Sequence, residues 1–247
     1  MCQLEFCEAN KTYPAPHLET LEPYENKAET QYESASQNNN GDLLDAITNN
    51  IIDSDILIRT YFHQFISALE DIHSQGIAHL NLKLENLVLS TDFMLEIENF
   101  ENAQYIADGY METRGSQGYR AQEVINEECE DLEAADVYSA GVILYALKAK
   151  KFPFVEIDQG DCINVKDYAL FVKNNEGFWK NKNILMGDEK FFDEEFRRLI
   201  NGMLERNVAK RFNIEQIKES EWFQGPVLSD EALKKEMKMK YEAKISN

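Results

Sequence analysis

The sequence predicts an α+β fold that is mainly α-helical, and three observations point to this class. Apolar side chains recur at helical spacing over residues 54–75, which is typical of a long core helix. A second stretch, 134–148, is apolar on nearly all sides, as a buried helix is. Between them, "NLVLS" and "MLEIENF" have the length and composition of short strands joined by a turn. The expected architecture is therefore helical with small β-hairpins.

The first forty residues show few signals of a packed core. Residues 4–7, "LEFC", have the pattern of a short strand end. Residues 11–40 are polar and hold three of the five prolines, a composition typical of a disordered insertion. The segment that follows, "GDLLDAI" at 41–47, predicts the start of a short helix.

The long helix is predicted together with both of its ends. Ser54 is a suitable N-cap, and Gly76 supplies the stop. The apolar stripe consists of Ile58, Tyr61, Phe62, Phe65, Ile66, Leu69 and Ile72. Beyond the helix, Ser90–Thr91–Asp92 is the expected turn between the two strand-like segments. Residues 101–118 are expected to form a loop.

The C-terminal half of the chain is expected to be mainly helical. The clearest segments are "DEEFRRLINGMLE" at 193–205 and "NIEQIKESEWF" at 213–223. A lysine-rich helix is expected over 229–244, starting at Ser229. Trp179 and Trp222 are expected to anchor the core, because large aromatic side chains dominate core packing.

The composition is that of an acidic, folded protein. The chain has 247 residues, a formal net charge of −20 and a pI of about 4.6. This acidity argues against nucleic-acid partners and against docking on anionic membranes, while it permits attraction to basic partners. The four cysteines are scattered without a CxxC pair, which favours neither zinc nor disulfides. The N-terminus has no signal-peptide pattern and no apolar run could span a bilayer, so an intracellular, cytoplasmic protein is expected.

Six segments in order resemble those of a known family. They are "HLNLKLEN" (79–86), "ENF" followed by Glu101, "GSQGYRAQEV" (115–124), "ADVYSAGVILYAL" (135–147), "PF" (153–154) and "RNVAKRFNIEQIKESEWF" (206–223). Through them, residues 41–225 resemble the C-terminal lobe of eukaryotic protein kinases, most closely the calcium/calmodulin-dependent-kinase-like Ser/Thr group. The resemblance implies a kinase-like C-lobe at 41–225 and a hinge-like strand remnant at 1–10. Composition adds a disordered insertion at 11–40 and a lysine-rich C-terminal helix at 226–247.

Asn81 stands where this family has its catalytic aspartate. That aspartate accepts a hydrogen bond from the substrate hydroxyl and aligns it for attack. An amide takes up no proton at physiological pH, and losing general-base assistance costs about 10²–10⁴ in rate. Lys83 matches the lysine that faces the γ-phosphate, unless it is simply a solvated loop lysine. Glu85 matches a position that could meet a basic substrate side chain.

Both metal-binding positions of the family are neutral in this sequence. Asn99 stands where an aspartate would hold Mg²⁺, and Asn86 matches the second ligand but is also suited to cap its local turn. Mg²⁺ normally needs a carboxylate beside the phosphates. Glu98 and Glu101 flank Asn99 and could compensate, while Glu101 also replaces a glycine, which implies lost backbone freedom there. No cofactor is expected; ATP and Mg²⁺ would bind only if residual binding survives.

Only part of an ATP cleft is encoded. The first glycine of the chain is Gly41, and no segment before it resembles a glycine-rich loop or a VAIK strand. The N-terminal lobe is therefore expected to be missing. By resemblance, Glu5 and Cys7 would offer hinge backbone groups to adenine, Asp42 would meet the ribose and Val88 would lie under the base.

The residues that hold the lobe together are retained better than those that perform chemistry. By resemblance, His79 is a packing histidine, Glu123 and Arg211 form a buried ion pair, and Asp136 holds the backbone of the catalytic loop. Leu80 replaces an arginine that normally receives an activation-loop phosphate.

Hydroxyl groups in the activation-loop equivalent raise the question of regulation. Thr113 and Ser116 are candidate phosphosites by their position in that loop. The alternative is an unmodified loop, because hydroxyl side chains are common in loops of any function.

Together these features favour a pseudokinase: a kinase-like domain that binds or regulates a protein partner, such as a kinase or a basic peptide, without transferring phosphate. The alternative is an ATP-dependent protein serine/threonine kinase whose upstream sequence is missing, and a third possibility is a decaying gene product. A C-lobe alone would expose apolar surface near the hinge, so self-association or cover by a partner is also expected.

Overall fold

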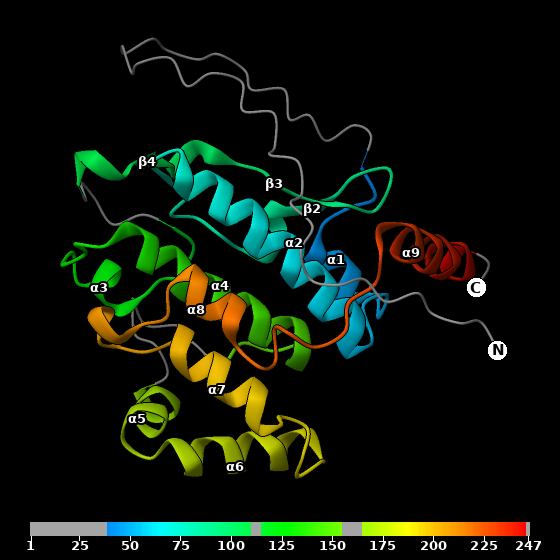
Figure 1. Ribbon diagram of the computed structural model, residues 1–247. Helices are drawn as coiled ribbons and strands as arrows, with labels where there is room; N and C mark the ends of the chain where they lie inside the picture. Colours follow the sequence, from blue (N-terminus) through cyan, green and yellow to red (C-terminus); the bar gives the residue numbers. More distant parts are fainter. Residues whose placement is uncertain (1–38, 110–114, 155–164, 246–247) are drawn as a thin grey trace.

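Helix α4 (Leu132–Ala149) lies in the middle of the fold, between α2 (Asp55–Ser74) on one side and α7 (Glu194–Met203) on the other (Figure 1). Nearly all of its side chains are buried, which explains why its sequence is apolar all round instead of along one stripe. This computed structural model describes residues 39–109, 115–154 and 165–245. The predictions made for Glu5, Cys7 and Thr113 lie outside these ranges.

The ends of the two long helices follow from local capping. Ser54 is the N-cap of α2, as predicted, and Gly76 follows the helix with φ of +74°, a conformation that suits glycine. The N-cap of α4 is Asp131, whose carboxylate accepts a 2.9 Å hydrogen bond from the Ala134 backbone N–H. The helix therefore begins at Leu132, two residues earlier than the apolar pattern indicated, because Glu133 interrupts the apolar run.

Shorter helices complete the fold and confirm its mainly helical class. They are α1 (Leu43–Thr48), α3 (Gln122–Ile125), α5 (Val165–Lys173), α6 (Asn175–Met186), α8 (Ile214–Glu219) and α9 (Asp230–Ile245), with 3₁₀ turns η2 (Leu84–Asn86), η3 (Phe100–Asn102), η4 (Ile106–Asp108) and η5 (Val208–Lys210). Helices α5 and α6 pack on each other at the end of the molecule beyond α7 (Figure 1). In the described ranges, no helix is long and apolar enough to cross a membrane.

Two small antiparallel strand pairs pack against α2. Strands β2 (Leu87–Leu89) and β3 (Leu95–Ile97) form the predicted hairpin, with Val88 opposite Glu96. Strands β1 (Ile77–Ala78) and β4 (Gln104–Tyr105) also pair, within a region where 101–118 was expected to be loop. That expectation was wrong for β4, because a two-residue strand is too short to show a period of two.

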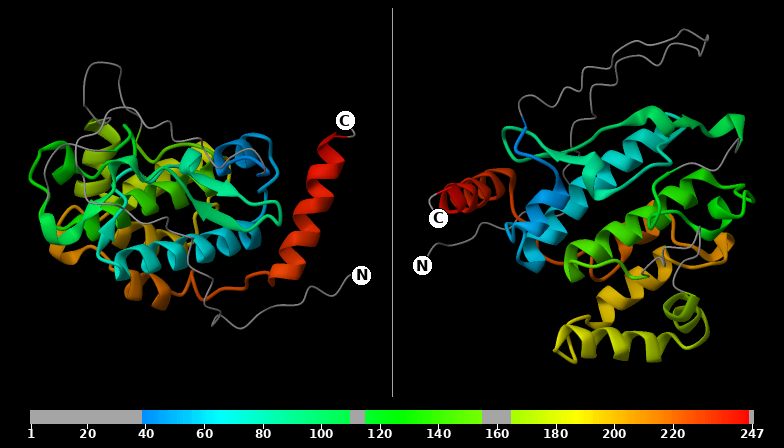
Figure 2. Two further views of the ribbon diagram at one scale, coloured as in Figure 1. Left: turned by 90° about the horizontal axis from the view of Figure 1, so that it is seen from above. Right: turned by 180° about the vertical axis from the view of Figure 1, so that it is seen from behind.

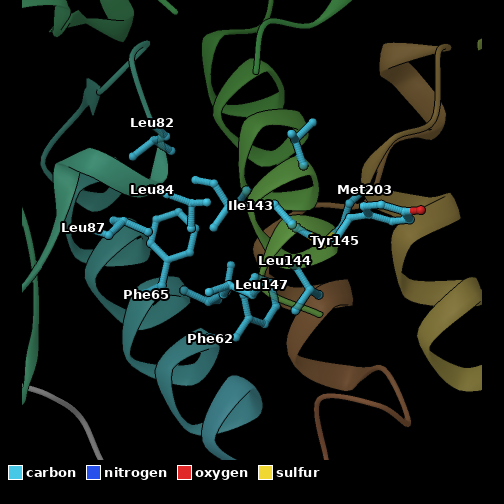
Figure 3. Packing of buried hydrophobic residues seen from close by; sticks show 14 of the residues in the cluster. Phe62, Phe65, Leu82, Leu84, Leu87, Ile143, Leu144, Tyr145, Leu147 and Met203 are labelled. Atoms are coloured by element: carbon cyan, nitrogen blue, oxygen red, sulfur yellow. The ribbon is translucent and has the colours of Figure 1, made fainter. Parts of the chain in front are cut away.

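The core forms where α2, α4 and the chain after β1 meet. Figure 3 shows the packed side chains of Phe62, Phe65, Leu82, Leu84, Leu87, Ile143, Leu144, Leu147 and Met203. Trp179 and Trp222 are each 1% exposed, as expected of core anchors, and the Trp222 ring lies edge-on to Phe62 at 6.0 Å between centroids. Helix α9 lies beside α1 and the β2–β3 hairpin (Figure 2).

Truncating a central core side chain should destabilise the whole lobe. We expect Leu144→Ala, at a fully buried position of α4, to lower the free energy of unfolding by about 2–5 kcal/mol, because the cavity cannot collapse completely. Leu185→Ala, at a position 70% exposed, is the matched control and should change it by less than about 0.5 kcal/mol. Urea unfolding followed by circular dichroism measures both, and equal effects would contradict the packing described.

Candidate functional site

The buried carboxylate of Asp136 organises the segment that resembles a catalytic loop. Asp136 lies on α4 and is 1% exposed. Its Oδ2 accepts hydrogen bonds from the His79 backbone N–H at 2.7 Å and from His73 Nε2, on α2, at 3.0 Å. Its Oδ1 accepts from the Leu80 N–H at 2.8 Å. One side chain of the central helix therefore holds two consecutive peptide groups of the loop.

The hydrogen bonds to Asp136 stabilise a strained backbone conformation at Leu80. Leu80 has φ of +58°, in the left-handed region that costs an ordinary L-residue roughly 1–2 kcal/mol. Gly115 has φ of +92°, and a Cβ there would lie 2.5 Å from the Leu80 carbonyl oxygen. The segment at 115 can approach the loop this closely only because it carries a glycine.

His79 is a buried connector between the loop and the Asn99 region. Its Nδ1 accepts a 3.2 Å hydrogen bond from the Asn81 N–H, and its Nε2 lies 3.0 Å from the Glu98 carbonyl oxygen. This pattern assigns the neutral tautomer with the proton on Nε2. Burial lowers the pKa of His79, so the neutral ring is favoured. The Phe100 ring packs on it, with 4.9 Å between centroids.

Asn81 is buried and bonded within the chain. Its side-chain Oδ1 accepts a 2.8 Å hydrogen bond from the Ser116 hydroxyl, and its carbonyl oxygen accepts one of 2.8 Å from Asn86 Nδ2. The amide oxygen thus binds a hydroxyl, as the family's aspartate does, but it carries no charge and takes up no proton. Ser116, one of the candidate phosphosites, is half-buried in this contact.

The two metal positions are adjacent through the backbone. The Glu98 N–H donates to the Asn86 carbonyl oxygen at 2.9 Å, which places Asn99 directly after this contact. Asn99 is exposed and has φ of +64°, a conformation that asparagine tolerates better than most residues. Glu101 lies inside η3 and has no positive φ, so this turn does not use the backbone freedom that a glycine would provide at that position. The left-handed residue of this turn is Asn99.

These donors do not fit a magnesium–nucleotide site. Asn81, Asn86 and Asn99 offer only neutral amide oxygens, whereas Mg²⁺ is usually held through one or two carboxylates. Burial and the neighbouring Glu96 raise the pKa of the Glu98 carboxyl. Across the part of the chain that the structure describes, no three His, Cys, Asp or Glu side chains come together as metal ligands.

The structure brings Asp42 and Val88 together at the edge of the hairpin. They face each other in an antiparallel bridge, and the Leu89 N–H donates to the Gly41 carbonyl at 2.8 Å. The Asp42 carboxylate caps α1 by accepting from the Asp45 N–H at 2.8 Å, while burial raises the pKa of Asp42. The two residues expected on the adenine side of a cleft are therefore neighbours.

Lys83 directly precedes the short turn η2, and Glu85 is its middle residue. Lys83 is the N-cap residue of η2 and is half-buried, while Glu85 is exposed. The Tyr119 hydroxyl lies 3.4 Å from both Glu85 Oε2 and the Leu84 backbone nitrogen, and burial raises the pKa of Tyr119. The activation-loop equivalent is thus held against η2 by a buried tyrosine.

Glu123 and Arg211 form a buried ion pair that joins α3 to the chain after η5. The Arg211 side chain is 1% exposed and contacts both carboxylate oxygens of Glu123, at 2.5 and 3.2 Å. Arg211 also donates to the carbonyl oxygens of Ala134 at 2.8 Å and Glu205 at 2.9 Å. These hydrogen bonds to a carboxylate and to two backbone carbonyl oxygens compensate the burial of the guanidinium charge.

Sequence reasoning missed one residue of this site and two of its contacts. His73, which donates to Asp136, is separated from it by 63 positions and had no motif of its own. The bond from Ser116 to Asn81 and the close approach of Gly115 to Leu80 also join distant segments. The one sequence signal for these contacts was Gly115, directly before Ser116. So close an approach to another backbone requires a residue without a Cβ.

A central apolar helix, a loop fixed by its aspartate and a buried Glu–Arg pair define a kinase-like C-terminal lobe. The family model for the protein kinase domain matches residues 20–223. CBL-interacting serine/threonine-protein kinase 20 of Arabidopsis thaliana is 34% identical over 191 residues, or 74% of this chain and 39% of that protein. CBL-interacting protein kinase 31 of Oryza sativa subsp. japonica is 35% identical over 188 residues, or 74% and 38%. The chain belongs to the protein kinase family, and the matched part spans about two fifths of these relatives.

Removing the charge of Asp136 should loosen the loop it holds. In Asp136→Asn one acceptor oxygen becomes a donor facing other donors, so we expect a loss of about 1–3 kcal/mol in the free energy of unfolding. Hydrogen exchange at the His79 and Leu80 amides should accelerate as well. Asp131→Asn is the matched control on the same helix, because asparagine caps as well as aspartate does. Unchanged exchange at both amides in Asp136→Asn would contradict this role.

Breaking the buried ion pair should be costly in a way that an exposed pair is not. We expect Glu123→Gln to lower the free energy of unfolding by about 3–5 kcal/mol, because Arg211 remains buried and charged. Glu194→Gln, which removes the exposed partner of Arg198, should cost less than about 1 kcal/mol. Chemical denaturation compares the two variants, and similar losses would show that the burial of Arg211 does not matter.

Proposed function

We propose that the chain is a pseudokinase domain: a protein-kinase-like lobe that acts by binding or regulating a protein partner and does not transfer phosphate by the family's mechanism. The single observation that carries this proposal is the Asn81 amide, whose oxygen already accepts the Ser116 hydroxyl and which has no carboxylate charge. A general base must take up a proton, and an amide does not.

The metal positions support the same proposal. Phosphoryl transfer depends on positioning and on neutralising the charge that develops on the phosphates, which Mg²⁺ normally provides. Asn86 and Asn99 both offer uncharged amide oxygens, and the Asn99 side chain is exposed to solvent. Under this proposal ATP and Mg²⁺ are not required for function, and Lys83 is a remnant of the family's phosphate-facing group.

A protein partner fits the surface chemistry. Five exposed carboxylates lie between α3 and the first turn of α4, at Glu127, Glu128, Glu130, Asp131 and Glu133. Such a run attracts a basic peptide or a basic face of another kinase, through a field that salt screens. We also propose that the protein self-associates and is located in the cytoplasm.

Exposed apolar side chains on α6 support the proposed self-association. On α6, Ile184 and Leu185 are 62% and 70% exposed, which makes them the most exposed large apolar side chains in the described ranges, together with Met239 at 62%. Leu44, on α1 beside the hinge-like side, is only 37% exposed. Adjacent exposed apolar side chains favour contact with another protein.

A second candidate function is that of an ATP-dependent protein serine/threonine kinase. The relatives named above are described as CBL-interacting kinases, and the matched part covers 39% and 38% of two of them. A lobe supplied by further sequence would provide the missing phosphate-binding elements, although it would not restore the charges at Asn81 and Asn99. The kinase candidate is supported by similarity to these relatives, and the pseudokinase candidate by the residues at Asn81 and Asn99.

A radiolabel transfer assay with [γ-³²P]ATP and Mg²⁺ separates the two candidates. We expect no incorporation into a general kinase substrate above the background of Lys83→Ala, the variant that controls for contaminating kinases. Transfer that is present in the natural chain and disappears in Lys83→Ala would overturn the pseudokinase proposal. A thermal-shift titration with ATP, with and without Mg²⁺, adds a readout independent of turnover, and we expect no Mg²⁺-dependent rise in Tm.

A further inference from the structure

The C-terminal helix α9 is fixed to the lobe by a stripe of apolar side chains. Leu233 and Met237 are fully buried, and Tyr241 continues the stripe one turn later at half exposure. These positions are four residues apart, so they share one face of the helix. Met239, between them in sequence, points to the opposite side and is 62% exposed. Figure 2 shows α9 running past α1 and the hairpin end of the molecule.

Polar contacts tie the same helix to three separate segments. The Tyr241 hydroxyl donates a 2.8 Å hydrogen bond to the Asn40 carbonyl oxygen, and its ring packs on Phe93 with 5.1 Å between centroids. Lys240 forms an ion pair with Asp53 at 2.7 Å, just before α2. Lys234 forms a second ion pair with Asp92, in the turn between β2 and β3. The helix therefore bridges the hairpin, the start of α2 and the segment 40–42.

The segment 40–42 is held by few contacts besides those of α9: the Asn40 side-chain amide donates to the Ser90 carbonyl oxygen at 2.7 Å, and Asp42 caps α1. The segment also pairs with β2 through two backbone hydrogen bonds, from the Asn40 N–H to the Leu89 carbonyl at 2.7 Å and from the Leu89 N–H to the Gly41 carbonyl at 2.8 Å. These bonds continue into the isolated bridge between Asp42 and Val88. A ladder this short is marginal in water by itself. Its position therefore depends on what packs beside it.

We propose that α9 is a strap: it holds the segment 40–42 in register on β2, so that the bridge between Asp42 and Val88 forms only while α9 is docked. The bond from Tyr241 to the carbonyl of Asn40 acts on the residue that begins the ladder. The aspartates at 53 and 92 set where the helix lies along the lobe. Release of α9 then frees the chain that carries Asp42, without unfolding the core around α4. This coupling links the C-terminal helix to the ligand-facing edge of the lobe, and it does not depend on catalysis.

Hydrogen–deuterium exchange of the full chain tests the strap. We expect Met237→Ala, which removes the buried anchor, to accelerate exchange at the amides of Asn40 and Leu89 by at least about tenfold, because a buried methionine contributes well over a factor of ten in stability. Exchange within α4 should stay unchanged. Met239→Ala is the matched control at an exposed position of the same helix and should leave both amides as they are.

A milder pair of variants removes one bond and keeps the packing. Tyr241→Phe retains the ring on Phe93 and should accelerate exchange at Asn40 and Leu89 by about fivefold, the usual worth of one such hydrogen bond. Tyr105→Phe, at a side chain 46% exposed, is its control. Unchanged exchange at Asn40 in Met237→Ala would overturn the strap. An equal acceleration throughout α4 would also overturn it, since α9 would then be part of the common core.

Discussion

The lobe depends on one buried charge and the donors that surround it. Asp136 is nearly inaccessible, and an unpaired carboxylate in that place would cost several kcal/mol. Two backbone N–H groups and His73 compensate it, and they come from the chain after β1 and from α2. The same bonds that satisfy the charge also hold Leu80 in a left-handed conformation. Helix packing, loop shape and the positions of His79 and Asn81 therefore follow from a single satisfied carboxylate.

This dependence explains how a kinase fold can lose charge at its chemical centre and keep its shape. Asparagine has the size of aspartate, so Asn81 still accepts a hydroxyl and still offers its carbonyl to Asn86. Asn99 occupies a left-handed turn that asparagine tolerates well. The carboxylates that remain, Glu123 and Asp136, are those with buried partners whose loss would leave an uncompensated charge. Neutralising the exposed or hydroxyl-facing positions costs the fold little.

Local sequence patterns predicted the helices and strands, whereas contacts between residues far apart in sequence determine the geometry of the candidate site. The apolar stripe of α2, its N-cap at Ser54 and the β2–β3 hairpin follow from periodicity and capping, so sequence alone predicted them. The pairing of β1 with β4 and the bond from His73 to Asp136 join segments far apart in sequence, where periodicity carries no information. The sequence directed attention to Glu101 as the replaced glycine, whereas the positive φ of this turn lies two residues earlier, at Asn99, which only backbone geometry reveals.

The forces that dock α9 are unequal, and this sets how the strap can respond. The pair between Lys234 and Asp92 is largely exposed, so it contributes little and weakens further with salt. Lys240 and Asp53 are better sheltered, yet both remain in contact with solvent. The buried Leu233 and Met237 therefore supply most of the docking free energy, while the lysines select the register on an otherwise acidic body. Because Tyr241 is the last member of the apolar stripe, its bond to Asn40 forms only when the helix is seated in that register.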